Sequence, residues 1–264
     1  MHLFSVKLPI IDKKVHLPEI IIDTLRSNDI TLQNGDIIVI SEKIVATSQG
    51  RIVNLSKIEK ISDKAKKLSR KYDMDERLVE LILREAHMIL GGMTHVILAK
   101  VGNFLIANAG IDQSNAGNGN VVLLPKNIEK IVWDFWRIFK ETYHLDKLGV
   151  IIADSRVQPL RKGTIGLAIA SAGFEPIEDM RGQPDLFGRP LAITMRAIAD
   201  DLASAAQFLL NEGNQQTPVV IIRGANVQFT DNPRSTPDMP AEECLYMNIF
   251  SKYLLKKRKE LKNN

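Results

Sequence analysis

The chain has 264 residues, with 35 lysines and arginines against 31 aspartates and glutamates, a formal net charge of +4 and a pI near 9.0. Hydrophobic residues make up 45% of the chain and charged residues 25%, which excludes an intrinsically disordered, collagen-like or disulfide-scaffold protein. The single cysteine, Cys244, has no partner for an internal disulfide, and no run of eighteen uncharged apolar residues occurs, so we expect a cytoplasmic protein without a membrane span.

The positive charge is concentrated at the C-terminal end. Residues 252–264 contain six basic residues and one acidic residue, whereas the rest of the chain contains 29 basic and 30 acidic residues. Because the rest is close to neutral, the high pI does not predict a nucleic-acid-binding face. The basic run over residues 256–259 could contact nucleic acid or an anionic membrane, but charged chain ends are usually solvated, and we expect neither partner.

Short apolar runs rich in β-branched residues recur along the chain, each bounded by Gly, Pro, Asn or Asp, which is typical of β-strands. They cover residues 36–40, 96–99, 104–107, 121–124, 150–153, 165–170 and 219–222. Helical spacing of apolar residues predicts helices after a cap at Asp75, over residues 128–139 and over the alanine-rich residues 194–210. Gly213 is the expected stop of that last helix.

Strands and helices are interspersed, and several strands are neighbours in sequence with turns between them. This pattern favours an α/β (or α+β) fold with a mixed β-sheet and flanking helices over a purely parallel sheet. Residues 231–240 contain three prolines and indicate a linker to a C-terminal helix. We therefore predict a catalytic domain over residues 1–230, followed by a linker and a basic helix over residues 231–264.

Several familiar catalytic patterns are missing. The sequence has no phosphate-binding P-loop, no dinucleotide-binding glycine fingerprint and no serine nucleophile elbow, and its five histidines never pair at metal-ligand spacing. The remaining candidates are acidic and small polar residues that directly follow predicted strands.

The first candidate segment follows the strand over residues 104–107, where a glycine turn presents Asp112, Ser114 and Asn115. A carboxylate in such a turn suits a hard cation, and Asn115 with free backbone amides suits a phosphate or a base edge. The alternative is a loop in which Asp112 and Asn115 only satisfy their own backbone.

The second candidate segment begins where the strand over residues 150–153 ends, at Asp154 and Ser155. In α/β sheets, ligands gather at the carboxyl ends of strands. Asp154 and Ser155 can hold Mg²⁺ or Mn²⁺, and Arg156, Arg161 and Lys162 supply cations for a phosphate or a carboxylate. Alternatively, Asp154 caps a turn and the arginines pair with surface acids.

Two further segments complete the set. Glu212 and Gly213 follow the alanine-rich helix, and Ser41 and Lys43 follow the strand over residues 36–40. The helix dipole disfavours a glutamate at a helix C-terminus, which suggests a ligand there, and Lys43 could reach a phosphate. Either could also be an ordinary surface residue. Carboxylates at separate strand ends, with cations and glycine turns nearby, describe a site for a nucleoside triphosphate and divalent metals.

Taken in order, these segments resemble the coenzyme F420-0:γ-glutamyl ligase family. The most specific stretch is NAGIDQSN at residues 108–115, and GVIIADS at residues 149–155 and PVVIIRG at residues 218–224 also match. The remaining matches cover residues 34–51, 78–86, 173–194 and 197–213.

The resemblance implies an activity and an assembly. It implies an enzyme that joins the α-amine of L-glutamate to the terminal carboxylate of F420-0 through an acyl-phosphate, while GTP is converted to GDP and phosphate. It also implies Mn²⁺ or Mg²⁺ at two sites, allows K⁺ as a further cofactor, and implies a γ-glutamyl ligase-like fold, an intertwined homodimer and a site in a groove.

The family's functional residues fall on matching positions of this chain. The metal ligands correspond to Asp112, Asp154, Ser155 and Glu212. The GTP contacts correspond to Ser41, Asn115 and the loop over residues 210–217, which includes Gly213, Asn214 and Thr217. We assign Lys43 to the nucleotide as well, and Asp154, Arg156 and Arg161 to catalysis.

Two segments depart from the family's pattern. Residues 156–163 read RVQPLRKG where the family usually has Phe-Gly-Arg and an aromatic before Arg-x-Gly, and residues 46–50 read ATSQG where it has Ser-Lys-Ala-Glu-Gly. Both segments lie near the expected nucleotide and acceptor, so an amide ligase of the same chemistry with a different acceptor stays open. A nucleotide-binding protein without turnover is a further alternative, against which the retained Asp112, Asp154 and Glu212 argue.

Overall fold

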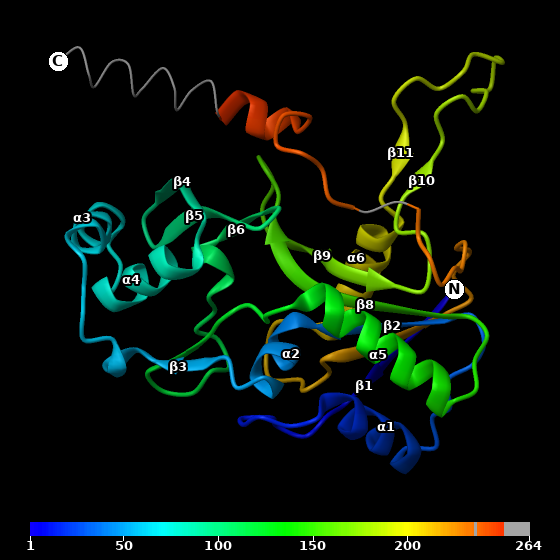
Figure 1. Ribbon diagram of the computed structural model, residues 1–264, viewed down its shortest axis with the longest axis horizontal. Helices are drawn as coiled ribbons and strands as arrows, with labels where there is room; N and C mark the ends of the chain where they lie inside the picture. Colours follow the sequence, from blue (N-terminus) through cyan, green and yellow to red (C-terminus); the bar gives the residue numbers. More distant parts are fainter. Residues whose placement is uncertain (235–236, 251–264) are drawn as a thin grey trace. The chain divides into compact units, whose positions relative to one another are not determined.

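The computed structural model describes residues 1–234 and 237–250 (Figure 1). Contacts divide these residues into two compact units: unit 1 comprises Met1–Leu55 and Ile111–Pro237, and unit 2 comprises Ser56–Gly110 and the residues from Asp238 onward. The division at residue 230 that composition suggests stays a prediction. Residues 245–250 are helical, and the basic tail over residues 252–264 lies outside the described residues. No helix within the described ranges is long and apolar enough to cross a membrane.

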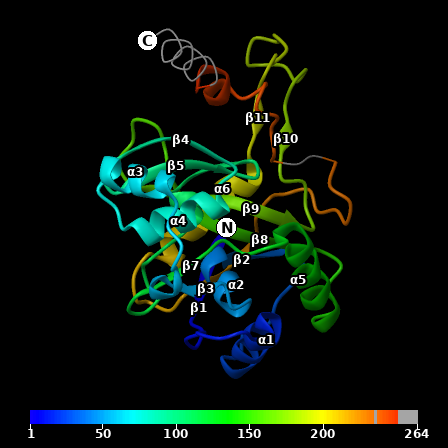
Figure 2. The same ribbon diagram turned by 60° about the vertical axis from the view of Figure 1, so that its left-hand side comes forward.

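Unit 1 is built on a five-stranded sheet with the order β1-β12-β2-β8-β9 (Figures 1 and 2). The strands are β1 (His2–Val6), β12 (Val219–Arg223), β2 (Asp36–Ser41), β8 (Leu148–Val157) and β9 (Thr164–Ala172). β2 and β8 run parallel, and the other neighbours are antiparallel, so the predicted mixed sheet is confirmed. Ser41 lies opposite Ala153 in the register, so β2 ends there, whereas β8 continues to Val157. The prediction that this strand ends before Asp154 is therefore wrong, because pairing with β9 extends it through Asp154, Ser155 and Arg156.

The central strands each contain an uninterrupted apolar stretch because helices cover both faces of the sheet. The stretch from Ile37 to Ile40 has no exposed surface. Helix α6 (Ile198–Leu210) packs on one face, and its buried side chains share a core cluster with β2, β8 and β12. Helix α5 (Ile128–Thr142) covers the opposite face, with α1 (Leu17–Ser27) beside it (Figure 1).

Helix α6 approaches β9 so closely that residue 166 must be a glycine. A Cβ atom on Gly166 would lie 2.3 Å from the carbonyl oxygen of Ala203. Two hydrogen bonds hold this contact: Ser204 Oγ donates to the Gly166 carbonyl at 2.9 Å, and the Ala168 N–H donates to Asp200 Oδ1 at 2.9 Å. The position of α6 on the sheet is therefore determined by backbone contact.

Both ends of α6 differ from the sequence prediction. Met195–Arg196 forms β11, which pairs with β10 (Glu178–Asp179), so the helix predicted from residue 194 begins only at Ile198. The helix ends at Leu210 and is followed by Asn211 at φ 57°, so the predicted stop at Gly213 is wrong. The physical reason is that asparagine, like glycine, tolerates the left-handed backbone that ends a helix.

The remaining elements of unit 1 frame the edge of the sheet. α2 (Glu42–Ser48) follows β2 directly, and β3 (Ile52–Asn54) pairs with β7 (Asn120–Val122). The chain preceding β7 is held to it by an isolated bridge between Asp112 and Val122. This bridge fixes the start of the loop that carries Asp112.

In unit 2, two consecutive helices precede a small antiparallel sheet. The helices are α3 (Asp63–Tyr72) and α4 (Glu76–Glu85), and the sheet is β4-β5-β6, formed by Met88–Met93, Val96–Val101 and Phe104–Ala107. The predicted cap at Asp75 is confirmed, because its Oδ1 accepts a hydrogen bond from the Arg77 N–H at 2.8 Å. Short 3-10 helices cover Leu55–Lys57 and Asn108–Gly110.

Candidate functional site

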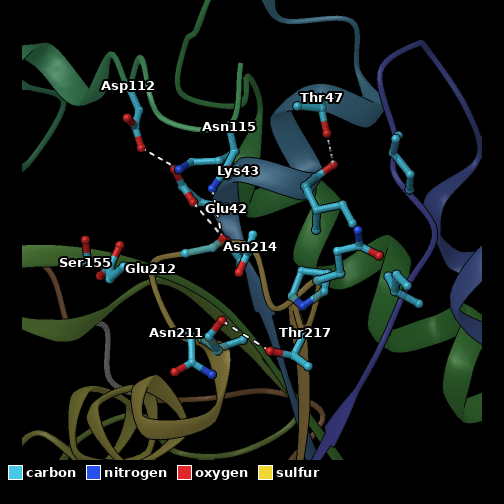
Figure 3. Close-up of a pocket in the computed structure, with 18 of the residues that line it drawn as sticks. Glu42, Lys43, Thr47, Asp112, Asn115, Ser155, Asn211, Glu212, Asn214 and Thr217 are labelled. Atoms are coloured by element: carbon cyan, nitrogen blue, oxygen red, sulfur yellow. Dashed lines mark hydrogen bonds and ion pairs between the residues drawn. The ribbon is translucent and has the colours of Figure 1, made fainter. Parts of the chain in front are cut away.

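A pocket of about 420 Å³ opens in unit 1 where β2 ends beside residues 153–155 of β8 (Figure 3). Its walls come from segments that are distant in sequence, which cover residues 8–11, 41–47, 112–117, 153–155 and 207–218. The volume lies in the range of small-molecule sites, which is roughly 300–1,000 Å³. The parallel register of β2 and β8 is what brings two of these segments together.

Charge is unbalanced in the lining. Four acidic residues, Glu42, Asp112, Asp154 and Glu212, face a single basic residue, Lys43, among the lining residues of the described chain. Carboxylates in such a group repel one another unless protons or cations compensate them. The pocket therefore favours a ligand that brings positive charge.

Lys43 and Asp112 form an ion pair inside the pocket, with Nζ 2.5 Å from Oδ2 (Figure 3). Nζ also donates to Ser114 Oγ at 2.9 Å, and Ser114 donates to the Asp112 carboxylate from its N–H at 2.7 Å and from Oγ at 2.9 Å. Burial raises the pKa of Asp112, but the hydrogen bonds from Lys43 and Ser114 outweigh it and hold the pKa below its usual value. Asp112 is thus kept ionised.

Glu42 and Asp154 behave in the opposite way. Glu42 is 7% exposed, and burial followed by the charge of Asp154 raises its pKa well above the usual value. Burial raises the pKa of Asp154 to about 7; the N–H of Ser155, 2.7 Å from Oδ1, lowers this pKa, and the charges of Asp112 and Glu212 raise it further. These two carboxyl groups hold protons more readily than a solvated carboxylate does.

Glu212 lies in the loop that follows α6. Its Oε1 accepts hydrogen bonds from Gln207 Nε2 at 2.7 Å and from Thr164 Oγ1 at 3.4 Å. Thr217 Oγ1, at the other end of the loop, donates to the Leu209 carbonyl at 2.8 Å. Both ends of the loop are thereby attached to the last turn of α6.

Asn115 connects the two loops. Its Nδ2 donates to the Gly213 carbonyl at 3.1 Å, and its backbone is left-handed, with φ 56°. Asparagine is one of the few residues that adopts this conformation readily. The loop with Asp112 and the loop after α6, separated by about a hundred residues, therefore meet at the pocket.

Ten of the predicted site residues line this pocket: Ser41, Lys43, Asp112, Asn115, Asp154, Ser155, Glu212, Gly213, Asn214 and Thr217. Arg156 and Arg161 are not among the lining residues. Arg156 Nε is buried and has no hydrogen-bond partner in the described chain, and Arg161 is exposed in the turn between β8 and β9. Their assignment to catalysis stays a prediction.

Sequence reasoning overlooked several lining residues. Glu42 stands between Ser41 and Lys43 just after a buried strand, so the signal that pointed to its neighbours applied to it as well. Gln207 lies in the last turn of α6, and no sequence signal marks it, whereas Asn211 belongs to the loop over residues 210–217 that the resemblance assigns to the nucleotide. Residues 8–11 form an apolar wall that precedes any predicted element.

The donor set suits a hard divalent cation, because carboxylate and hydroxyl oxygens are the preferred ligands of Mg²⁺ and Mn²⁺. Over residues 1–234 and 237–250, no three His, Cys, Asp or Glu side chains stand close enough together to hold a metal. Instead, Lys43 forms an ion pair with Asp112, and Gln207 donates a hydrogen bond to Glu212. The chemistry of the residues fits a cation, which would replace these contacts.

A mixed sheet with an acidic pocket at the carboxyl end of β2, lined also by hydroxyl and amide groups, is the arrangement in which α/β proteins hold ligands. The chain belongs to the F420-0:Gamma-glutamyl ligase family, whose sequence model matches residues 5–224. It is therefore an enzyme of the ligase class, and the resemblance that the sequence motifs indicate is confirmed. The matched range includes every residue predicted for the site.

Three similar proteins are each named Coenzyme F420:L-glutamate ligase. The protein of Methanocaldococcus jannaschii is 39% identical over 220 residues, which are 82% of this chain and 86% of that protein. The Methanopyrus kandleri protein is 39% identical over 194 residues, 73% of this chain and 76% of its own length. The Archaeoglobus fulgidus protein is 31% identical over 221 residues, 83% and 86% of the two chains.

Proposed function

We propose that this enzyme forms an amide bond between L-glutamate and the carboxylate of F420-0, using GTP and divalent metal ions. The observation that carries the proposal is the convergence of four carboxylates and one lysine on a single pocket in a chain of this family. The names of the relatives support the two substrates. The nucleotide, the metals and the intermediate are proposed from the chemistry of the pocket.

The nucleotide would bind along the two loops that Asn115 connects. Ser41 and Lys43 lie at the start of α2, and Gly213, Asn214 and Thr217 lie in the loop after α6. Lys43 supplies the positive charge that phosphate oxygens need, and the hydroxyl and amide groups supply hydrogen bonds. The apolar wall over residues 8–11 and Ile44 suits the flat face of a base.

The metal ions would be held by Asp112, Asp154, Ser155 and Glu212, with Mn²⁺ or Mg²⁺ at two sites and K⁺ as a further candidate. When bound, such ions neutralise charge on a phosphoryl group that is being transferred. Two features support this assignment: these residues offer oxygen ligands, and burial raises the pKa of Asp154 to about 7, which a cation beside the carboxylate would oppose.

The reaction would proceed in two steps. The acceptor carboxylate attacks the γ-phosphorus of GTP, the bond to the bridging oxygen breaks, and GDP leaves. The α-amine of L-glutamate, after losing a proton, then attacks the acyl carbon, the amide bond forms, and phosphate leaves. Arg156 and Arg161 are proposed to contact the anionic acceptor, because they follow Asp154 in the last part of β8 and in the turn after it.

The proposal also includes an intertwined homodimer and a cytoplasmic location. The dimer comes from the resemblance to the family, and sedimentation of the purified chain would test it. The location comes from the single cysteine, Cys244, which fits a reducing compartment.

The test combines purified protein with GTP, Mn²⁺, L-glutamate and F420-0 and follows GDP release together with the mass of the acceptor. We expect GDP formation that depends on glutamate and an acceptor heavier by one or more glutamyl units. Asp154→Asn should abolish turnover, while the control Asp63→Asn, at an exposed position of α3, should leave it unchanged. Absence of glutamate-dependent GDP with every carboxylate tested would refute the ligase.

A second candidate retains the chemistry and changes the acceptor. It is favoured by residues 156–163, which depart from the family's usual pattern directly after Asp154. In the same assay, glutamate-dependent GDP release with another carboxylate and none with F420-0 would select it. Tight GTP binding without GDP release would instead indicate a nucleotide-binding protein without turnover.

A further inference from the structure

Lys43 forms an ion pair with the Asp112 carboxylate, which a metal ion would need as a ligand. Both oxygens of Asp112 are engaged: Oδ1 accepts from the Ser114 N–H, and Oδ2 accepts from Ser114 Oγ and from Lys43 Nζ. The ammonium group at 2.5 Å is closer to Oδ2 than the 2.9 Å of the serine hydroxyl. Lys43 therefore provides the charge compensation of Asp112 in this arrangement.

The contact is accessible. The side chain of Lys43 is 21% exposed and that of Asp112 is 39% exposed, and both line the pocket. A lysine has a flexible stem and a compact charge, so its ammonium group can move by several ångströms without a change in the backbone. A cation that arrives through the pocket can thus compete with Nζ for the carboxylate.

The surrounding charges explain why a compensating cation is needed. Glu42, Asp154 and Glu212 line the same pocket, and Lys43 is the one basic residue in the described lining. Without Lys43, Asp112 would face three further carboxyl groups with no positive charge from the lining.

We infer that Lys43 is an exchangeable counter-ion: its ammonium group holds Asp112 in the metal-free enzyme, a divalent cation displaces it, and the released Nζ is then available to a phosphate oxygen of the nucleotide. The inference rests on the proposed function for the nature of the two ligands. It adds a positioning residue whose contact changes between the metal-free and the metal-bound protein.

Mn²⁺ binding to the full chain without nucleotide tests the exchange, with free Mn²⁺ measured by electron paramagnetic resonance. Lys43→Met should bind Mn²⁺ about tenfold more tightly than the wild type, because the competing charge-assisted hydrogen bond is gone. Lys43→Arg, which keeps the charge, should show a much smaller gain, and the control Lys64→Met on α3 should show none. With Asp112 replaced by Asn, adding Lys43→Met should no longer improve binding if the two residues act through their mutual contact.

A measurement on the wild type avoids any dependence on variant folding. Lys43 can be labelled with an amine-directed acylating reagent and quantified by mass spectrometry. Saturating Mn²⁺ without nucleotide should increase the labelling of Lys43 several-fold, since Nζ is released, while labelling of Lys64 stays constant. Subsequent addition of GDP should protect Lys43 again.

The outcomes separate this inference from the proposed function. Equal Mn²⁺ affinity in wild type and Lys43→Met, or unchanged Lys43 labelling at saturating Mn²⁺, overturns the exchange. If the wild type still adds glutamate with GTP and Mn²⁺, the ligase stands without it. If no protein binds Mn²⁺ with or without GTP, both the exchange and the metal-dependent ligase are overturned.

Discussion

Arg223 and Asp36 form a two-point ion pair that joins β12 to β2: Nε and Nη2 of the arginine each lie 2.8 Å from a different oxygen of the carboxylate. Asp36 is fully buried, and its Oδ2 also accepts the Gln33 N–H at 2.8 Å. β2 carries Ser41 at its other end, so this pair holds one of the two strands that reach the pocket.

Replacing Arg223 should lower the stability of the fold, because it leaves the buried carboxylate of Asp36 without its partner. We expect Arg223→Met to lower the free energy of unfolding by about 3 kcal/mol, and Asp36→Asn in the same chain to recover part of the loss. The control is Arg181→Met, whose partner Asp179 lies 2.6 Å away but whose side chains are both about half exposed, so the loss should stay below about 1 kcal/mol. Urea unfolding of the variants measures the differences, and equal losses for Arg223 and Arg181 would contradict the account.

Gly166→Ala should displace α6. The new Cβ would meet the Ala203 carbonyl oxygen at 2.3 Å, and because this oxygen belongs to the backbone of α6, the helix itself must move. We expect a loss of about 2 kcal/mol in unfolding free energy and a lower kcat/KM for GTP, since α6 leads into the loop with Glu212. Gly91→Ala in β4 is the matched control, because its Cβ would meet nothing within 4 Å. Similar losses in both variants, measured by urea unfolding and GDP release, would argue against a packing effect.

The sequence predicts the central strands of the sheet, where burial dominates, but not α1, although five of its eleven residues are buried. The strand over residues 104–107 was placed on the residues that form β6, and the runs at β2 and β12 are apolar because both faces of the sheet are covered. α3 escaped prediction because only Ala65, Ser69 and Tyr72 of its ten residues are buried, which leaves almost no apolar stripe. β1 escaped it because Val6 alone is buried in that strand.

The site was predictable residue by residue but not as an arrangement. The sequence singles out Asp112, Asp154 and Glu212 one by one, although Asp154 lies within β8 and not after it. Their convergence depends on the β2–β8 register and on the close approach of α6 at Gly166. Neither the strand register nor the close approach of the helix can be predicted from local sequence patterns. Lys43 could be suspected of binding phosphate, but its pairing with Asp112 links residues about seventy positions apart and needs the folded loops.

Asn115 offers a test of the junction between the two loops. Asn115→Gly keeps a residue that tolerates φ 56° but removes the amide that donates to the Gly213 carbonyl. We expect KM for GTP to rise about tenfold with a smaller change in kcat, since the loop after α6 loses its support. Asn127→Gly is the control, because that asparagine also has a left-handed backbone, with φ 54°, and makes no side-chain cap hydrogen bond. An unchanged KM in Asn115→Gly would remove the contact from nucleotide binding.

The pKa of Asp154 leads to a prediction about stability and pH in the metal-free protein. Burial raises this pKa to about 7 in the folded chain, whereas the unfolded chain has the usual value near 3.8. Between these values the folded state binds more protons than the unfolded state, so this group lowers the stability progressively as pH rises from about 4 to about 7.

Asp154→Asn removes this loss of stability. In EDTA, the melting temperature of the variant should match that of the wild type near pH 4 and exceed it by several degrees at pH 8. Mn²⁺ at pH 8 should reverse the order, because it compensates the carboxylate of the wild type and has less to bind in the variant. Thermal unfolding at pH 4, 6 and 8 measures these differences, with Asp63→Asn as the control. A difference in melting temperature that does not depend on pH would show that ionisation of Asp154 does not lower the stability.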